Sequence, residues 1–540
     1  MRCGDSEAGT YMRDIQYPGR SVVMSTEGMV ATSQPMATQV GLQVLRKGGN
    51  AMDSAIAAGA TQCVTEPQST GIGGDCFVLY HEANSGKLYG LNGSGRAPRR
   101  ATLEEYRRRG YTEIPEHGIH SVSVPGAIDA WHTAQQRFGT MSLEELLAPA
   151  IRYAEEGWAV SPVVAKVWKQ NESFLGQCES TRRTLLREGH APVAGTRYRQ
   201  RNLAHSLRLI AHAGRDAFYN GEIAEQIVAY SKANDGLLDL EDFAEHHSEW
   251  VEPISTVYRG LRLCEIPPNG QGITTLMMLN MLENTEVGAL AHLSAEHIHL
   301  FTEAFRLAMA ERDRFVCDPD FSDIPVAAML SKEFGRKQWA RIEATRTLKH
   351  PVAPGLPQHR DTIYLSVVDA QRNACSFINS LYHPWGSGVV AGDSGVMLQN
   401  RGAGFNLIAG HPNCIAPAKR PLHTIIPAMA YRDDRLTLCF GVMGGAYQAM
   451  GHAYVLSNWL DFAMDLQESV DAPRFLPTAD MLVLERPIPA VTREQLQRRG
   501  HRIADAEKPF GGAQCIYIDR QEGVLQAASD PRKDGCALGY

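Results

Sequence analysis

Thr362 is the residue whose type and position best suit covalent chemistry in this sequence. It opens the segment TIYLSVVD, whose β-branched residues predict a strand over 362–369, and it follows a proline-rich polar stretch over 352–360. A threonine hydroxyl is a poor nucleophile until a base removes its proton. The α-amine of the same residue can be that base, because its pKa of about 7.7–8.0 lies near working pH. That amine exists only if the Asp361–Thr362 bond is cut, and the hydroxyl can make this cut by attacking the Asp361 carbonyl.

Two further features suit such a nucleophile. Gly444 and Gly445, in GVMGGAYQAMG, precede a predicted helix over 446–463, so their backbone N–H groups can point at a developing oxyanion. An ordinary strand-to-helix turn would explain the same pair. Ser380 lies in a second predicted strand, 374–381, which forms a hairpin with the first. Either Ser380 or its neighbour Asn379 can face the nucleophile, because alternation does not show which face is inward.

Several long blocks of the sequence resemble the γ-glutamyltransferase (γ-glutamyltranspeptidase) family, in the same order. They are MVATSQPMATQVGLQVLRKGGNAMDSAIAAGA (29–60), EPQSTGIGGDCFVLY (66–80), SVSVPG (121–126), YRGLRLCEIPPNGQGI (258–273), DTIYLSVVD (361–369) and SDPRKDGCALGY (529–540). The threonine of the fifth block aligns with the nucleophile by which that family cleaves its own precursor. The resemblance therefore implies an autocatalytically processed zymogen, cut into a large subunit (1–361) and a small subunit (362–540). It also implies that Gly444 and Gly445 bind the oxyanion and that Ser380 places a hydroxyl near Thr362.

The positions at which the family binds a γ-glutamyl group are changed in this sequence. The arginine that clamps the α-carboxylate is replaced by Ser94, although Arg96 lies two residues on and can substitute. The aspartate that binds the α-amine belongs to a pair of acids, and the pair reads Ala403-Gly404 here. The lost acid matters most, because an unpaired buried ammonium is costly and selects against amino-acid substrates.

Three more substitutions fall at the expected substrate site. The family's asparagine in the second hairpin strand becomes Tyr382, and its serine pair becomes His423-Thr424. Arg96, Arg401, His423 and Thr424 are then candidates for binding an anion that carries no amine, with Tyr382 and Asn379 beside them. Each arginine can instead be a structural ion-pair partner, and His423 can be a core histidine that caps a carbonyl.

Three functions remain open at this point. The changed positions favour a small acid amide as substrate, as in the family branch that contains oxamate amidohydrolase. The family default is a γ-glutamyl amide such as glutathione. A third alternative is an uncleaved binding protein without enzymatic activity, against which the retained Thr362 and glycine pair argue.

The elements around these residues predict an α+β protein. Helical spacing or capping signals indicate helices over 37–46, 52–63, 142–155, 294–315, 446–463 and 491–499. Strand patterns cover 76–80, 362–369, 374–381, 395–399, 424–431, 435–441, 481–485 and 514–518. Helices combined with mainly antiparallel strands suggest sheets between helical layers. The family resemblance sharpens this to a four-layer αββα sandwich of the N-terminal-nucleophile hydrolase type, built jointly by the two subunits.

The composition indicates which partners, cofactors and cellular compartment to expect. The chain has 540 residues and a net charge of −7, which argues against a nucleic-acid partner. Its 11 cysteines include no CxxC pair, and His and acidic residues do not fall at metal-ligand spacing, so we expect neither a metal nor another cofactor. No apolar leader and no membrane-length apolar run is visible, so we expect a cytoplasmic protein. The sequence leaves open whether the heterodimer assembles further into a homo-oligomer.

Overall fold

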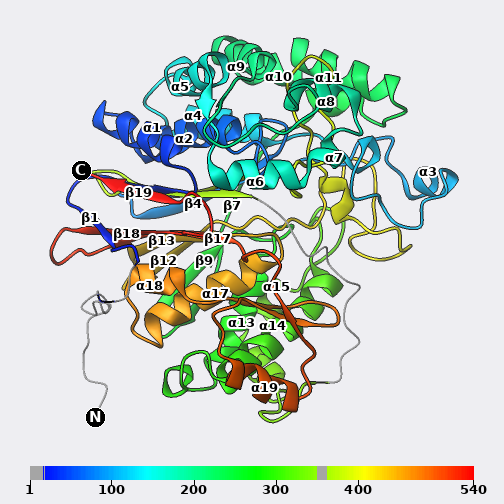
Figure 1. The fold of residues 1–540 in the computed structure, drawn as a ribbon. Coiled ribbons are helices and arrows are strands. Elements are labelled where there is room, and N and C mark those ends of the chain that lie inside the picture. Colours follow the sequence, from blue (N-terminus) through cyan, green and yellow to red (C-terminus); the bar gives the residue numbers. More distant parts are fainter. Residues whose placement is uncertain (1–15, 17–18, 349–361) are drawn as a thin grey trace.

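Two seven-stranded antiparallel sheets stack face to face at the centre of the molecule (Figure 1). The computed structural model describes residues 16, 19–348 and 362–540. The first sheet has the order β19 (Cys536–Gly539), β2 (Met29–Thr32), β10 (Ile363–Val368), β11 (Ala374–Ser380), β3 (Asp75–Glu82), β4 (Lys87–Gly93) and β7 (Glu249–Val251). The second has the order β1 (Val23–Ser25), β18 (Leu525–Ser529), β17 (Gly512–Ile518), β13 (Arg435–Met443), β12 (Ala428–Arg432), β9 (Leu261–Glu265) and β8 (Ile254–Tyr258).

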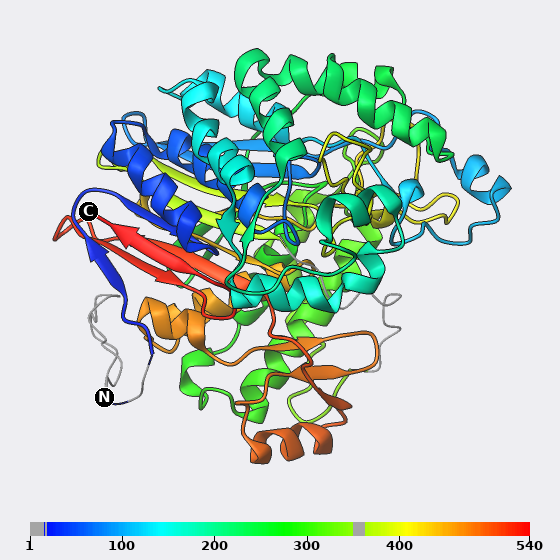
Figure 2. The same ribbon diagram turned by 45° about the horizontal axis from the view of Figure 1, so that its top comes forward.

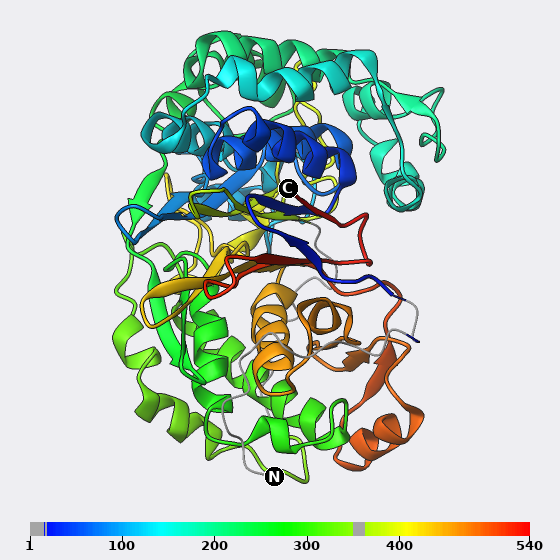
Figure 3. The ribbon, with the colours of Figure 1, turned by 90° about the vertical axis from the view of Figure 1, so that its left-hand side faces the viewer.

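Helices cover the outer face of each sheet (Figures 1 and 3). The first sheet is covered by α1 (Pro35–Arg46), α2 (Ala51–Thr65), α4 (Ala127–Phe138), α5 (Leu143–Glu156), α6 (Pro162–Gln170), α7 (Glu172–Leu175), α8 (Glu179–Leu185), α9 (Arg201–Ala213), α10 (Arg215–Tyr219), α11 (Glu222–Ala233) and α12 (Leu240–Ala244). The second is covered by α13 (Gly272–Leu282), α14 (Ala295–Phe315), α15 (Val326–Met329), α16 (Lys332–Trp339), α17 (Tyr447–Leu460), α18 (Leu466–Asp471) and α19 (Ala490–Arg498). The predicted αββα sandwich is therefore confirmed.

Smaller elements lie outside these four layers. They are α3 (Leu103–Arg108), the 3-10 turns η1 (Ile119–Ser121), η2 (Val287–Ala289) and η3 (Arg401–Gly404), the sheet of β14 (Phe475–Pro477), β15 (Leu482–Leu484) and β16 (Ile503–Asp505), and the pair β5 (Trp158–Ala159) and β6 (Arg197–Tyr198). No helix in the described part of the chain is long and apolar enough to cross a membrane.

Local sequence explains the main helices. Ser142 and Glu145 form the predicted capping box at the start of α5, each satisfying a backbone N–H that the helix leaves unbonded. Every residue of α2 is buried, because this helix lies between the first sheet and α5 and is apolar almost all round. The two short β-branched strands of the predicted hairpin likewise form as β10 and β11.

Both faces of β10 and β11 are buried, which the alternation of side chains explains. Ile363 and Phe377 point into the core beneath the first helical layer, while Tyr364 and Ile378 point into the core between the sheets. A strand covered on both faces has no solvent side, so its apolar residues run continuously. The hairpin thus forms the rigid centre on which Thr362 sits.

One predicted strand is wrong. Residues 395–399 form a loop closed by a single bridge between Val390 and Met397, and the loop continues no ladder. Gly392 and Gly395 lie between the two bridged residues and both have positive φ, which breaks the extended conformation within the loop. The strand predicted over 424–431 exists, but it begins only at Ala428.

The segments before and after the predicted cut are interleaved in both sheets. β10 pairs with β2 on one side, and β11 pairs with β3 on the other. At the edge of the molecule β18 and β19 lie alongside β1 and β2, as the red and blue strands of Figure 2 show. Neither segment could complete a sheet without the other.

Candidate active site

Thr362 lies directly before β10 and is almost completely buried. Its Oγ1 is 3.0 Å from the Oγ of Ser380. The hairpin register creates this contact, because Ile363 pairs with Asn379 and so brings the next residues on each strand together. The backbone N–H of Tyr382 also donates to Ser380 Oγ at 2.9 Å, which fixes the serine hydroxyl beside the threonine. The predicted contact of Ser380 with Thr362 is present in the structure.

Asn379 points away from this contact, into the core beneath the helices. Its side-chain amide donates to Thr70 Oγ1 at 2.8 Å, and its carbonyl oxygen accepts from Trp131 Nε1 at 3.2 Å. Adjacent strand residues alternate between faces, so only one of Asn379 and Ser380 can face Thr362. The structure places Ser380 there, and Asn379 instead ties β11 to the helical layer.

The glycine pair lies across the sheet interface from Thr362. A Cβ on Gly441 would lie 2.5 Å from the ring of Tyr364, and Ser366 Oγ donates to the Cys439 carbonyl at 3.2 Å. Two residues further along β10, from Tyr364 to Ser366, the facing residue on β13 is two residues further back, from Gly441 to Cys439. The same spacing in the other direction places Thr362 opposite the end of β13, which Gly444 follows.

Gly444 and Gly445 have φ values of 127° and 60°, in the region that favours glycine. Their carbonyls accept from the N–H groups of Tyr447 and Gln448 and so begin α17. Neither glycine N–H donates to another residue in the described ranges. Two backbone donors beside a nucleophile, at the start of a helix, are the arrangement that an oxyanion hole requires.

A buried glutamine holds this glycine turn in place. Gln271 Nε2 donates to the carbonyls of Gly445 at 2.9 Å and Thr424 at 2.7 Å. Arg312 in turn donates to Gln271 Oε1 at 2.8 Å. Sequence reasoning did not single out Gln271 or Arg312. Gln271 does lie in the block YRGLRLCEIPPNGQGI, so that block was the available signal.

Arg401, Tyr382 and Thr424 form one cluster joined to Thr362. Arg401 donates from NH1 to Thr424 Oγ1 at 2.8 Å, and its guanidinium lies 4.4 Å from the centre of the Tyr382 ring. Both Arg401 and Thr424 are buried. The N–H of Tyr382 donates to Ser380 Oγ, and Ser380 contacts Thr362. A continuous chain of contacts therefore connects Thr362 to Arg401.

His423 lies next to this cluster and is paired with an acid. Its Nε2 donates to Asp75 Oδ2 at 3.0 Å, and both side chains are fully buried. Burial and the nearby Arg401 charge lower the pKa of His423 to about 4, so the ring is neutral at working pH. The N–H of Ile425 approaches His423 Nδ1 at 3.4 Å, which engages the second ring nitrogen. This arrangement suits a positioning role better than direct anion binding.

Asp75 is a site residue that sequence reasoning missed. It pairs across the strands with Ser380, and its Oδ1 accepts from the N–H of Gly126 at 2.9 Å and from Gln399 Nε2 at 2.8 Å. With His423 on Oδ2, this carboxylate already has three donors. It lies in GIGGD, within the block 66–80 that resembles the family, so that block was the available signal.

Arg96 lies in a separate ion-pair cluster. Its guanidinium donates to Glu249 at 2.9 Å and lies 3.7 Å from Asp318, and Arg420 contacts the same two acids. No contact between Arg96 and a residue of the Thr362 cluster is present within the described ranges. The structure thus favours the structural alternative for Arg96, and its anion-binding role stays an untested prediction. Asp361 lies outside the described residues.

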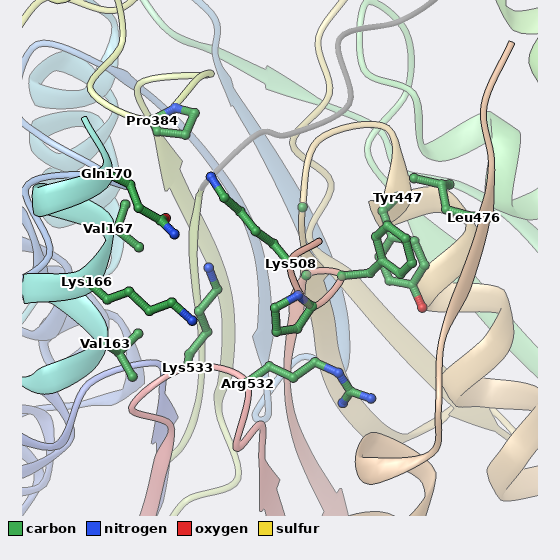
Figure 4. A pocket seen from close by; sticks show the side chains of 14 residues that line it. Val163, Lys166, Val167, Gln170, Pro384, Tyr447, Leu476, Lys508, Arg532 and Lys533 are labelled. Atoms are coloured by element: carbon green, nitrogen blue, oxygen red, sulfur yellow. The ribbon is translucent and has the colours of Figure 1, made fainter. Parts of the chain in front are cut away.

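A pocket of about 180 Å³ opens beside the glycine turn (Figure 4). Gly444 and Tyr447 form part of its wall, and the Tyr447 ring stacks on Phe510 with centres 5.6 Å apart. The described residues also contain two groups that could hold an ion, Glu116-His117-His383 and His299-Glu303-His501. Neither group includes Thr362, Ser380 or the glycine pair.

A buried threonine opening a central strand of an αββα sandwich, with two glycine N–H groups nearby, defines the N-terminal-nucleophile class of hydrolases. Comparison with known proteins supports this class. The family model of gamma-glutamyltranspeptidase matches residues 37–540, and the chain belongs to this family. It is an enzyme of that class, whose members mature by self-processing.

Individual relatives span nearly the whole chain. A glutathione hydrolase-like YwrD proenzyme of Bacillus subtilis is 38% identical over 96% of this chain and 99% of its own length. An oxamate amidohydrolase proenzyme of Klebsiella pneumoniae is 32% identical over 96% and 99%. The crystal structure of a cephalosporin acylase from Bacillus halodurans superimposes with a TM-score of 0.91 at 40% identity, over 98% of this chain and 99% of the other. These relatives support amide hydrolysis as the general reaction.

Proposed function

We propose that the chain cuts itself before Thr362 and then hydrolyses a small amide whose acyl group carries a carboxylate but no α-amine, as in oxamate. The observation that carries this proposal is the cluster beside Thr362, in which the described residues include an arginine but no acid that is available to an ammonium group. Two relatives' names support the first part, since the YwrD protein and the oxamate amidohydrolase are both called proenzymes.

The reaction follows from the groups at the site. The Thr362 amine takes the proton of Oγ1, and the oxygen attacks the amide carbonyl. The N–H groups of Gly444 and Gly445 stabilise the resulting oxyanion. The C–N bond then breaks as the ammonium returns its proton to the leaving nitrogen, and an ester on Thr362 remains. Water, deprotonated by the same amine, hydrolyses the ester and releases the acid.

The acyl preference rests on charge. Arg401 lies over Tyr382 and against Thr424, so a carboxylate on the acyl group has a guanidinium within the cluster. The family's amine-binding acids correspond to Ala403 and Gly404 in η3, directly after Arg401. Asp75 does not replace them, because its oxygens already accept from three donors. An acyl group with a free ammonium would therefore lack a counter-ion.

A γ-glutamyl amide remains the second candidate. It is favoured by the similarity to a glutathione hydrolase-like proenzyme at 38% identity, above the 32% of the oxamate amidohydrolase. Side-by-side assays decide between the two: ammonia release from oxamate, and nitroaniline release from γ-glutamyl-p-nitroanilide. Efficient turnover of the second substrate with none of the first would overturn the proposed acyl preference.

Self-cleavage is tested separately on a denaturing gel. The wild type should give two bands that sum to 59.4 kDa, and Thr362→Ala should give one. Intact mass should place the new terminus at Thr362. A wild type that stays one band would favour the uncleaved binding protein, and a Thr362→Ala variant that still splits at this bond would remove Thr362 from the mechanism.

A further inference from the structure

Lysines from three separate parts of the chain meet in the pocket beside Gly444. Lys166 comes from α6, Lys508 from the loop before β17, and Lys533 from the turn before β19. Figure 4 shows their amines reaching into the same space, Lys166 from the helix and Lys508 from the opposite wall. No acidic residue is among the described residues that line this pocket.

The local contacts leave two of these lysines available. Neither Lys166 nor Lys508 has a hydrogen bond or ion pair with another residue of the described chain. The fourth cation of the wall, Arg532, is held by Glu485 at 2.7 Å and by Asp530 at 3.3 Å, so it acts as part of the wall. Ammonium groups that face one space repel each other until an anion lies between them. The pocket is therefore arranged for a negatively charged group.

Gly444 relates this pocket to the reacting carbonyl. In the proposed reaction the oxygen of that carbonyl would point to the glycine N–H groups, and the acyl side would extend toward Arg401, which is hydrogen-bonded to Thr424. Arg401 and Thr424 do not line the pocket, whereas Gly444 does. The remaining substituent of the carbonyl, the leaving nitrogen, is the part that can enter the lysine pocket.

We propose that the pocket of Lys166, Lys508 and Lys533 binds carboxylates on the amine part of the substrate. This deepens the proposed function and rests on it: the natural substrate is an amide between a small acid and an acidic amine, such as an amino dicarboxylate. The volume of the pocket, about 180 Å³, suits a short group of a few carbons rather than a long peptide.

The kinetic test keeps the acyl group constant and changes the amine. N-oxalyl-glutamate is compared with N-oxalyl-glutaminamide, whose leaving amine carries carboxamides in place of both carboxylates. The wild type should prefer the first by about tenfold in kcat/KM, equivalent to ~1.4 kcal/mol, and added salt should reduce the preference. The double variant Lys166→Gln/Lys508→Gln should lose it. Lys169→Gln is the matched control, since Lys169 lies on the same helix, pairs with Glu172 and does not line the pocket.

Two further measurements separate this proposal from the acyl preference. In the first, glutamate and glutaminamide are each attached to a γ-glutamyl group in place of the oxalyl group. The ratio of the two kcat/KM values can then be measured even if oxalyl amides are not turned over. Calorimetric titration of L-glutamate into the processed enzyme measures the pocket without any turnover, and the double variant should weaken binding about tenfold. An unchanged ratio and unchanged glutamate affinity would overturn the lysine pocket. Equal losses for acidic and neutral amines would also do so, because they would place the lysines on the acyl side.

Discussion

At the scale of residues, the contact with Ser380 joins Thr362, the proposed nucleophile, to the rest of the site. The serine accepts the N–H of Tyr382 and meets Thr362 Oγ1 at 3.0 Å, so its hydroxyl has a fixed position. A fixed hydroxyl can orient the Thr362 oxygen toward an incoming carbonyl at little entropic cost. The neighbouring side chains of Arg401, Tyr382 and Thr424, by contrast, are the ones proposed to select the substrate.

Ser380→Ala should slow the reaction. Loss of one hydrogen bond to the nucleophile, of about 1.5 kcal/mol, corresponds to roughly a tenfold lower kcat. Both self-cleavage, followed on a gel, and hydrolysis at saturating substrate should show it. Ser255→Ala, on exposed β8, is the control. Unchanged rates in Ser380→Ala would show that Thr362 is oriented by its backbone alone.

At the scale of elements, the turn between β13 and α17 is built on two positive-φ glycines and held by Gln271. The turn ends a strand of one sheet opposite the first residue of a strand in the other. Since the sheets pack through a continuous apolar core, the turn cannot shift without disturbing that core. Preorganised N–H donors are effective because they need no rearrangement during the reaction.

Gly444→Ala should damage both stability and activity. A Cβ at φ 127° is strained and would lie 2.9 Å from the Cα of Gly511, so we expect about 1–3 kcal/mol of destabilisation and a loss of kcat. Gly523→Ala is the matched control, because its φ is 71° and a Cβ there meets nothing within 4 Å. Thermal melting and kcat are measured on both. Full activity in Gly444→Ala would contradict the oxyanion role.

At the scale of the whole molecule, the two segments that flank Thr362 share one pair of sheets. β10 lies between β2 and β11, so the new terminus would form inside a sheet that already contains both segments. Burial of the inter-sheet core depends on both as well. Cleavage therefore adds a terminus without releasing a domain.

The processed pieces should stay together without a covalent link. Gel filtration in native buffer should give one peak containing both bands, and separation should require denaturant, because ladders such as β10–β2 and β11–β3 cross between the pieces. Two separate native peaks would contradict this expectation.

Stability should fall as the pH drops below neutral. Burial lowers the pKa of several histidines, to about 4 for His81, His246 and His423 and to about 3 for His297 and His501. At these five histidines the unfolded chain, with pKa values near 6.5, binds more protons than the folded one between about pH 6.5 and pH 3. They outnumber the buried Glu66, whose pKa is raised to about 7 and which acts in the opposite direction. The free energy of unfolding should be highest above pH 6.5 and decrease through that window. Denaturant titrations at pH 7.5, 5.5 and 4.5 measure it, and a flat profile would contradict neutral buried histidines.

The sequence by itself determined the class of the protein and predicted which residues carry the catalysis. Long blocks that occur in the family's order predicted the sandwich, and the free-amine chemistry explains why a nucleophilic Thr362 would have to become a terminus. Strand periods located the hairpin, because β-branched alternation is a local property. The loop at 395–399 was misjudged, because its glycines decide the backbone there through positive φ.

Only the tertiary structure decided which candidates belong to the site. It brought Arg401, Tyr382 and Thr424 to Thr362, turned Asn379 toward the helices, and held Arg96 among acids far along the chain. It also revealed Asp75 behind His423 and the three lysines beside Gly444. Some of these contacts join residues hundreds of positions apart, such as Asp75 with His423 and Thr70 with Asn379, so no local pattern encodes them. They arise because the register of the paired strands and the stacking of the two sheets bring the strand ends together.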